Sequence, residues 1–229
     1  MSLQEAEAVR LHEIAQEFDS FSTPANSALP LDTKRLLDIF GASLALILFG
    51  PVMLITFLAL SIAGSPIFIQ QRVGRDGKLF PCYKFRTMVV TAEDVLADYL
   101  SNNPAAQEEW LRTFKLTQDP RITPMGHFLR KSSLDELPQL INVLRGEMSL
   151  VGPRPIVPAE VPRYRNRIRD YSRMRPGLTG LWQVSGRNLV SYRRRVALDS
   201  LYARRRTIFL DLVILMRTVS VVFLGTGAL

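Results

Sequence analysis

The chain has 229 residues and 47% hydrophobic content, enough for one domain with an ample core, and one domain is the simplest expectation. Its net charge of +8 indicates an anionic partner: nucleic acid, a phosphorylated small molecule or an anionic membrane surface. The single cysteine, Cys82, excludes an intramolecular disulfide, and the two histidines, His12 and His127, lack the spacing of a metal site.

The N-terminal arm, residues 1–33, predicts a short amphipathic helix over 4–18 and a linker rich in Ser, Pro and Asn over 20–30. The arm is acidic at its start and lacks a basic segment followed by an apolar one. We therefore expect no cleaved signal peptide and an N-terminus in the cytosol. The arm is given no catalytic role.

Residues 34–66 predict a membrane element, because residues 39–63 carry no formal charge. Gly50-Pro51 falls in the middle of this run, where proline should break or kink a helix. Both flanks are basic, with Lys34 and Arg35 before the run and Arg72 after it, and basic residues prefer the cytoplasmic side. A broken re-entrant hairpin satisfies both features, while a kinked span with the arm outside remains open.

Beyond residue 66 the pattern is mainly helical with one small β-hairpin. Two apolar-rich runs around Arg-Asp-Gly predict the hairpin over 66–88, and alternation places Lys84 and Arg86 on one strand face. The Pro-rich and Gly-rich stretches over 151–162 and 175–188 predict irregular structure. The predicted helices cover 92–100, 105–115, 134–144 and 192–222, the last interrupted by Asp211 and Arg217 and therefore interfacial or packed.

The stretch "SSLDELPQL" combines a helix start with two adjacent carboxylates, Asp135 and Glu136. Ser133 to Glu136 matches a capping box, and a purely structural cap is one interpretation. Adjacent helical residues point about 100° apart, so the two carboxylates would take different roles: one attacks phosphorus and the other holds a divalent cation such as Mg²⁺. Arg130 and Arg154 nearby would suit a phosphate.

The basic charge is concentrated in one third of the chain. Residues 151–206 contain fourteen Arg, no Lys and three acidic residues, a net charge of +11. Exclusive use of Arg favours fork-shaped contacts to phosphate or carboxylate, although a solvated basic face is an equal alternative for any single Arg. No aromatic residue is interleaved with the basic runs 193–195 and 204–206, which disfavours nucleic acid.

Three blocks in order, "GSPIFIQQRVGRDGKLFPCYKFRTM", "LRKSSLDELPQLINVLRGEMSLVGPRP" and "RPGLTGLWQVSGRN", strongly resemble the bacterial sugar transferases, the monotopic polyprenol-phosphate phosphoglycosyl transferases. The resemblance runs from about Lys34 to the C-terminus and is greatest to exopolysaccharide-initiating galactose or glucose-1-phosphate transferases. It implies a re-entrant membrane helix followed by a cytosolic catalytic domain, residues 67–229, on the bacterial inner membrane.

The resemblance also implies a reaction. Asp135 would attack the sugar-linked phosphate of a UDP-hexose and release UMP, and undecaprenyl phosphate would then take the sugar phosphate from Asp135. Glu136 would hold magnesium. One departure is Ser185, which stands where the family motif has Asn. The residues implied in substrate binding are Lys84, Arg86, Arg130, Arg154, Gln183, Arg187 and Asp211; Gln183, Asn188 and Asp211 lie in or near family motifs and have a structural role as the alternative.

The two substrates constrain where the site lies, because a soluble nucleotide sugar and a lipid phosphate meet only at the membrane interface. We expect the Arg-rich third to lie over lipid and substrate, with Trp182 either at that boundary or in the core. A membrane-anchored scaffold that binds anionic lipid through its arginines is the competing hypothesis. The sequence leaves open which hexose is moved and whether the chain forms a homo-oligomer.

Overall fold

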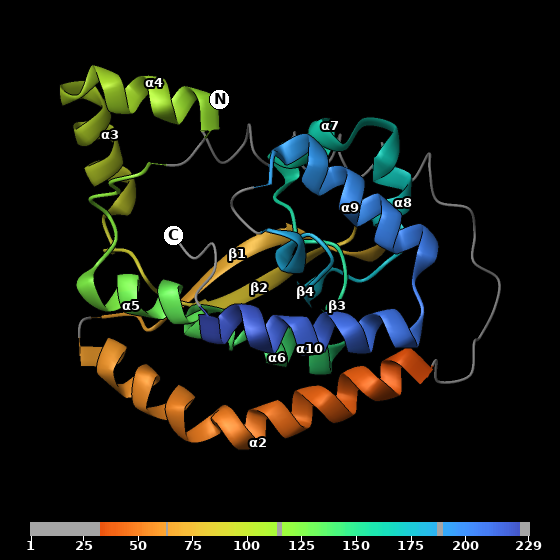
Figure 1. Ribbon diagram of the computed structural model, residues 1–229. Helices are drawn as coiled ribbons and strands as arrows, with labels where there is room; N and C mark the ends of the chain where they lie inside the picture. Colours follow the sequence, from red (N-terminus) through yellow and green to blue (C-terminus); the bar gives the residue numbers. More distant parts are fainter. Residues whose placement is uncertain (1–32, 63, 114–115, 187–189, 225–229) are drawn as a thin grey trace.

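The structure is a computed structural model that describes residues 33–62, 64–113, 116–186 and 190–224. These residues form a mainly helical molecule with two small two-stranded sheets, which confirms the predicted class. Figure 1 shows the sheets in the middle of the molecule. Helices α2 (Thr33–Ile62) and α10 (Ile208–Leu224) lie on one side of them, and α7 (Val161–Tyr164), α8 (Ile168–Ser172) and α9 (Tyr192–Arg205) lie on the other.

Helix α2 is continuous through Pro51, and Figure 1 shows it bent near its middle. Proline removes one intrahelical hydrogen bond and crowds the preceding turn, so the predicted disruption is a bend within one helix and not a break. Within the described residues, α2 is the one helix long and apolar enough to cross a membrane by length and composition. Its most exposed large side chains include Phe40, Ile47, Leu48, Ile55 and Ile62.

The first turns of α2 are tied to the rest of the molecule by polar contacts. Arg35 donates from its two Nη atoms to carbonyls in the last turn of α6 (Gln139–Arg145), at 2.6 and 2.8 Å. The buried carboxylate of Asp38 accepts hydrogen bonds from Ser149 Oγ and the Leu150 backbone N–H, both at 2.9 Å. Arg35 thus supplies donors to two helix-end carbonyls, and the Ser149 hydroxyl and Leu150 N–H supply donors to the buried Asp38 carboxylate.

The other end of α2 packs against the same body. Leu60 forms a buried cluster with Phe85 and Leu129, and Met53 and Ile67 pack against that cluster. A short connection after Ile62 then leads into the first strand. Both ends of α2 therefore contact one domain, while most of the helix between them exposes apolar side chains.

The predicted hairpin is confirmed. Strands β1 (Ile67–Val73) and β2 (Leu79–Phe85) pair antiparallel, with Ile67 opposite Phe85. The connection is a short 3₁₀ turn in which Asp76 has a positive φ of 56°. The side chain of Asn142 from α6 extends the pairing at the β2 edge, because it accepts from the Tyr83 N–H at 3.1 Å and donates to the Pro81 carbonyl at 2.7 Å.

Helices α3 (Ala92–Asn102) and α4 (Pro104–Thr113) begin close to the predicted positions. The two helices contact each other and, in Figure 1, form a hairpin set apart from α9 and α10. The last predicted residues, 114 and 115, lie outside the described part of the chain. Residues of α3 and α4 do not line the pocket described below.

The interpretation of Ser133 to Glu136 as a capping box is wrong. Ser133 adopts the left-handed conformation with φ of 59°, and its side chain does not cap the following turn. It ends an additional helix, α5 (Pro124–Ser132), whose cap is Thr123, since Thr123 Oγ1 accepts from the Gly126 N–H at 2.9 Å. The segment predicted as one helix from 134 divides into a 3₁₀ turn, η2 (Leu134–Glu136), and α6.

Of the two stretches expected to be irregular, 175–188 contains a short strand, and 151–162 begins at the end of another. Strands β3 (Ser149–Val151) and β4 (Gly177–Thr179) form a parallel pair. Their backbones approach so closely that a Cβ at Gly177 would lie 2.1 Å from the Gly152 backbone nitrogen. Glycine is therefore required at position 177, because the two strand backbones lie too close together for a side chain.

The predicted final helix over 192–222 is divided into α9 and α10 between Arg205 and Ile208. Thr207 causes the new start, because its Oγ1 accepts from the Leu210 N–H at 3.0 Å as an N-cap. The break lets α10 turn back along the β3 and β4 strands while α9 packs on α8.

Candidate active site

Asp135 lies in the 3₁₀ turn η2, between the end of α5 and the start of α6, with a partly exposed side chain. Burial and the adjacent Glu136 raise its pKa to about 6, while Lys84 and Arg130 act in the opposite direction. At neutral pH the carboxylate is mostly ionised but poorly stabilised. A carboxylate in this condition is suited to nucleophilic attack.

Glu136 has the opposite environment. Its Oε1 accepts a hydrogen bond from Lys84 Nζ at 2.6 Å. This ion pair joins the turn η2 to strand β2. Burial by itself would raise the pKa of Glu136, but Lys84 and Arg154 together hold it below the ordinary value. Two adjacent carboxyl groups with pKa values moved apart are typical of sites where each has a separate role.

Glu136 lines a small open pocket whose walls include residues of both sheets. The pocket is predominantly cationic, with three basic side chains against one carboxylate, so it suits an anionic ligand. Its lining residues are Arg72, Lys84, Glu136, Gln139, Arg154, Pro155, Gly177, Leu178 and Gln183.

Three of the predicted substrate-binding residues line this pocket: Lys84, Arg154 and Gln183. The Oε1 atom of Gln183 is buried and makes no hydrogen bond to any described residue. A buried amide oxygen without a partner indicates a place for a ligand or water. Arg187 and Asn188 lie outside the described residues.

Arg86, Arg130 and Asp211 are described but do not line the pocket. Arg86 stacks on Phe68, which is the cross-strand neighbour of Lys84, and its Nε donates to the Ser65 carbonyl at 2.9 Å. Arg130 donates from Nε to Thr87 Oγ1 at 2.9 Å and interacts electrostatically with Asp135. Arg130 therefore belongs to the Asp135 side of the site.

Asp211 is placed in a structural network instead. It is 1% exposed and accepts from Lys34 Nζ at 2.6 Å and Tyr202 Oη at 2.5 Å. These bonds join the start of α10 to α2 and α9. A buried carboxylate with partners from two other helices is explained by the fold itself.

Sequence reasoning did not include Arg72 and Gln139 among the site residues. Arg72 donates from Nη1 to the Pro155 carbonyl at 3.0 Å and from Nη2 to Gln70 at 2.5 Å, and its Nε is buried without a partner among the described residues. Arg72 could have been predicted from strand alternation, because Arg72 and Lys84 share a face of the hairpin. Gln139 is 2% exposed and has no such signal.

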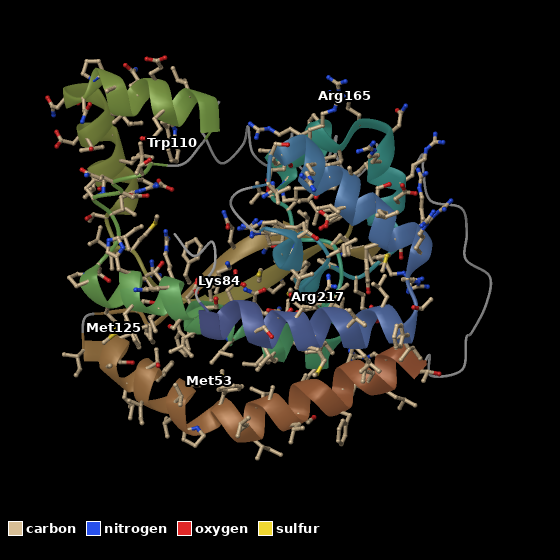
Figure 2. The ribbon with its side chains drawn as sticks, in the orientation of Figure 1. Met53, Lys84, Trp110, Met125, Arg165 and Arg217 are labelled. Atoms are coloured by element: carbon tan, nitrogen blue, oxygen red, sulfur yellow. The ribbon has the colours of Figure 1, made fainter. Side chains whose placement is uncertain are left out.

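The exposed arginines do not gather over α2. Figure 2 shows Arg165 on the side of the molecule opposite α2, with Lys84 between them. The expectation that the Arg-rich third lies over lipid and substrate stays a prediction: Arg163 and Arg169 lie on α7 and α8, away from α2, while Arg204 to Arg206 lie where α9 leads into α10. Trp182 is a core residue at 6% exposure. The exposed arginines are Arg163, Arg165, Arg167, Arg169, Arg173, Arg193, Arg194, Arg204, Arg205 and Arg206.

Comparison with known proteins identifies the class that this fold and site define. The family model for bacterial sugar transferases matches residues 30–225, and the chain belongs to this family. The identification by resemblance is thereby confirmed.

Several curated proteins are similar to the chain. The undecaprenyl-phosphate galactose phosphotransferase of Salmonella typhimurium is 52% identical over 85% of this chain and 41% of its own length. The exopolysaccharide production protein ExoY of Rhizobium meliloti is 49% identical over 85% of this chain and 87% of its own length. The UDP-glucose:undecaprenyl-phosphate glucose-1-phosphate transferase of Klebsiella pneumoniae is 38% identical over 91% of this chain and 43% of its own length. The chain spans about two fifths of the length of several of these relatives.

Proposed function

We propose that the chain is a phosphoglycosyl transferase that moves hexose-1-phosphate from a UDP-hexose to undecaprenyl phosphate, as the first step of exopolysaccharide synthesis. The family match and the names of the relatives support this activity, with galactose or glucose as the hexose. The observation that carries the mechanism is the contrast between Asp135, whose pKa is raised to about 6, and the adjacent Glu136, which is ion-paired with Lys84.

The first half-reaction makes a covalent intermediate. A carboxylate oxygen of Asp135 attacks the sugar-linked phosphorus, the bond from that phosphorus to the bridging oxygen breaks, and UMP leaves with the electron pair. Arg154, Lys84 and Arg72 line the pocket and hold the negative charge of the diphosphate. Arg130 faces Asp135 and limits how far burial raises its pKa.

The second half-reaction regenerates the enzyme. An oxygen of undecaprenyl phosphate attacks the same phosphorus, the acyl phosphate bond to Asp135 breaks, and the carboxylate returns to its ionised form. Polyprenyl-diphosphate-hexose is the product. The same cations serve both steps because each transition state places similar charge around one phosphorus.

The donor set fits a magnesium ion bound together with substrate. The described residues contain no cluster of three His, Cys, Asp or Glu. Mg²⁺ needs only one or two carboxylates, with water and substrate phosphate as its other ligands, and Glu136 with the unpartnered Gln183 Oε1 supplies oxygens in the pocket. When bound, the ion would neutralise charge on the diphosphate.

Membrane attachment through a re-entrant α2 completes the proposal, with the catalytic domain on the cytoplasmic face of the bacterial inner membrane. Three observations support it: α2 is bent, its middle is apolar and exposed, and both its ends contact the same domain. A helix that crossed the bilayer would carry its ends to opposite sides. The lipid phosphate carrier is then reached from the interface.

The test incubates the purified chain with Mg²⁺, undecaprenyl phosphate and radiolabelled UDP-galactose or UDP-glucose. We expect label in the lipid phase and one UMP released for each sugar phosphate transferred. Without the lipid acceptor, a stoichiometric burst of UMP and a labelled protein are expected. Release of UDP in place of UMP would show direct glycosyl transfer and overturn the mechanism.

A further inference from the structure

The guanidinium of Arg154 is held in an unusual way. Its Cζ lies 5.4 Å from the centroid of the Trp182 ring, and it makes no hydrogen bond or ion pair to a described side chain or carbonyl. The other two pocket cations are engaged, since Lys84 is bound to Glu136 and Arg72 to the Pro155 carbonyl. Contact through the ring face leaves all five N–H donors of Arg154 available to a ligand.

Trp182 is itself part of an alternating series of arginine and aromatic side chains. Arg195 Cζ lies 5.3 Å from the Trp182 ring and 4.2 Å from the Tyr192 ring, and Arg163 Cζ lies 5.1 Å from the Tyr192 ring. We call this series the arginine–aromatic ladder. It runs from Arg154 in the pocket to Arg163 on the exposed α7.

The inner part of the ladder is fixed. Trp182 is 6% exposed, and Arg195 donates from Nη2 to Glu160 Oε1 at 3.0 Å. Glu160 is held in turn, because its Oε2 accepts from the Val157 N–H at 3.1 Å. The carboxylate offsets the repulsion between two cations that share one indole.

We propose that Trp182, supported by Arg195 and Glu160, is a positioning residue for Arg154. The indole orients the guanidinium without using its donors, so that Arg154 presents them to the diphosphate of the nucleotide sugar. This role rests on the proposed function of the pocket. It goes beyond that function because it assigns to a buried aromatic residue the orientation of the substrate-binding cation.

A double-mutant cycle tests the proposal with four proteins: wild type, Arg154→Gln, Trp182→Leu and the double variant. We expect Trp182→Leu to raise KM for the UDP-sugar, and the dissociation constant for UMP, by about 5- to 10-fold, with a smaller change in kcat. In the Arg154→Gln background the same change should have no further effect. Equal losses in both backgrounds would reduce Trp182 to a packing residue and overturn the proposal.

Trp182→Phe is the conservative variant. The indole Nε1 is buried and has no hydrogen-bond partner among the described residues, so phenylalanine keeps a ring face and removes no bond. We expect KM within about 2-fold of wild type. If Trp182→Leu loses its cooperative thermal transition, Arg195→Gln replaces it in the cycle, because it keeps the buried ring and removes the support.

The matched control is Trp110→Leu, because Trp110 also carries a stacked arginine, Arg121, at 5.1 Å but lies on α4 away from the pocket. Its KM and kcat should stay at wild-type values. Two outcomes distinguish the role of the pocket from the role of the ladder. If Arg154→Gln leaves both UMP release and UMP affinity unchanged, the pocket's role in the proposed function is wrong; if Arg154→Gln is impaired but the cycle is additive, only the ladder is wrong.

Discussion

At the scale of single residues, two neighbouring carboxyl groups differ because of the charges around them. Asp135 has burial and a like charge beside it, which raise its pKa to about 6. Glu136 has Lys84 at 2.6 Å and Arg154 in the same pocket, which hold its pKa below the ordinary value. The ionised, reactive form of Asp135 therefore destabilises the folded state, as is common for groups in active sites.

Asp135→Asn should therefore abolish transfer, by at least ~10³-fold, and stabilise the fold. Because the folded-state pKa is raised, the native state binds a proton more readily than the unfolded chain, and the stabilising effect of protonation is lost as pH rises from about 4 to about 6. The ionised group then costs about 1 to 2 kcal/mol at pH 7, after allowance for its solvent contact.

The measurement is thermal unfolding of wild type and Asp135→Asn at pH 4 and pH 7.5. The variant should have the higher Tm at pH 7.5, and the difference should shrink at pH 4. Glu108→Gln, at an exposed position in the middle of α4, is the control and should behave as wild type at both values. An Asp135→Asn variant that transfers at the wild-type rate would show that Asp135 is not the nucleophile and would overturn the covalent mechanism.

At the scale of elements, the site depends on how closely β3 and β4 approach. Gly177 lines the pocket, and a Cβ there would overlap the Gly152 backbone at 2.1 Å. The loop after β3 carries Arg154, and the loop after β4 carries Trp182 and Gln183. The spacing of this two-stranded sheet therefore sets the width of the pocket and brings the ladder together.

Gly177→Ala should destabilise the protein by about 3 kcal/mol or more, since the clash is with backbone that cannot rotate away. Gly50→Ala on α2 is the matched control, because a Cβ there meets nothing within 4 Å. Alanine has the higher helix propensity, so this control should be neutral or slightly stabilising. Chemical denaturation in detergent, with transfer activity measured alongside, checks both. Equal effects of the two changes would contradict the close approach of β3 and β4.

At the scale of the whole molecule, α2 lies along one side and both its ends contact the same domain. The exposed Arg165 lies on the opposite side (Figure 2), whereas the exposed Arg204 to Arg206 lie at the turn from α9 to α10. Attachment to a membrane is therefore expected to use apolar area from α2, with additional exposed apolar side chains on α10 such as Phe209 and Met216. Surface arginine charge contributes less than composition alone would indicate.

This arrangement predicts that both flanks of α2 face the same compartment. Single cysteines at Ser20 in the arm and at Lys78 in the hairpin turn, in a Cys82→Ala background, should react with an impermeant maleimide only in inside-out membrane vesicles. Each position is labelled in separate preparations, with lysed vesicles as the control for total reactivity. Labelling of the Ser20 position from the periplasmic side, with Lys78 still cytoplasmic, would establish a kinked span.

The sequence by itself determined the features that reside in one segment: the apolar run with Pro51, the hairpin around Arg-Asp-Gly, and the adjacency of Asp135 and Glu136. Local periodicity and neighbouring residues carry that information. Only the tertiary structure decided that Arg72 and Gln139 line the pocket, that Asp211 joins three helices, and that Trp182 contacts Arg154 and Arg195. Such contacts join residues far apart in the chain, and they depend on how closely two short strands and their loops pack, which no local pattern encodes.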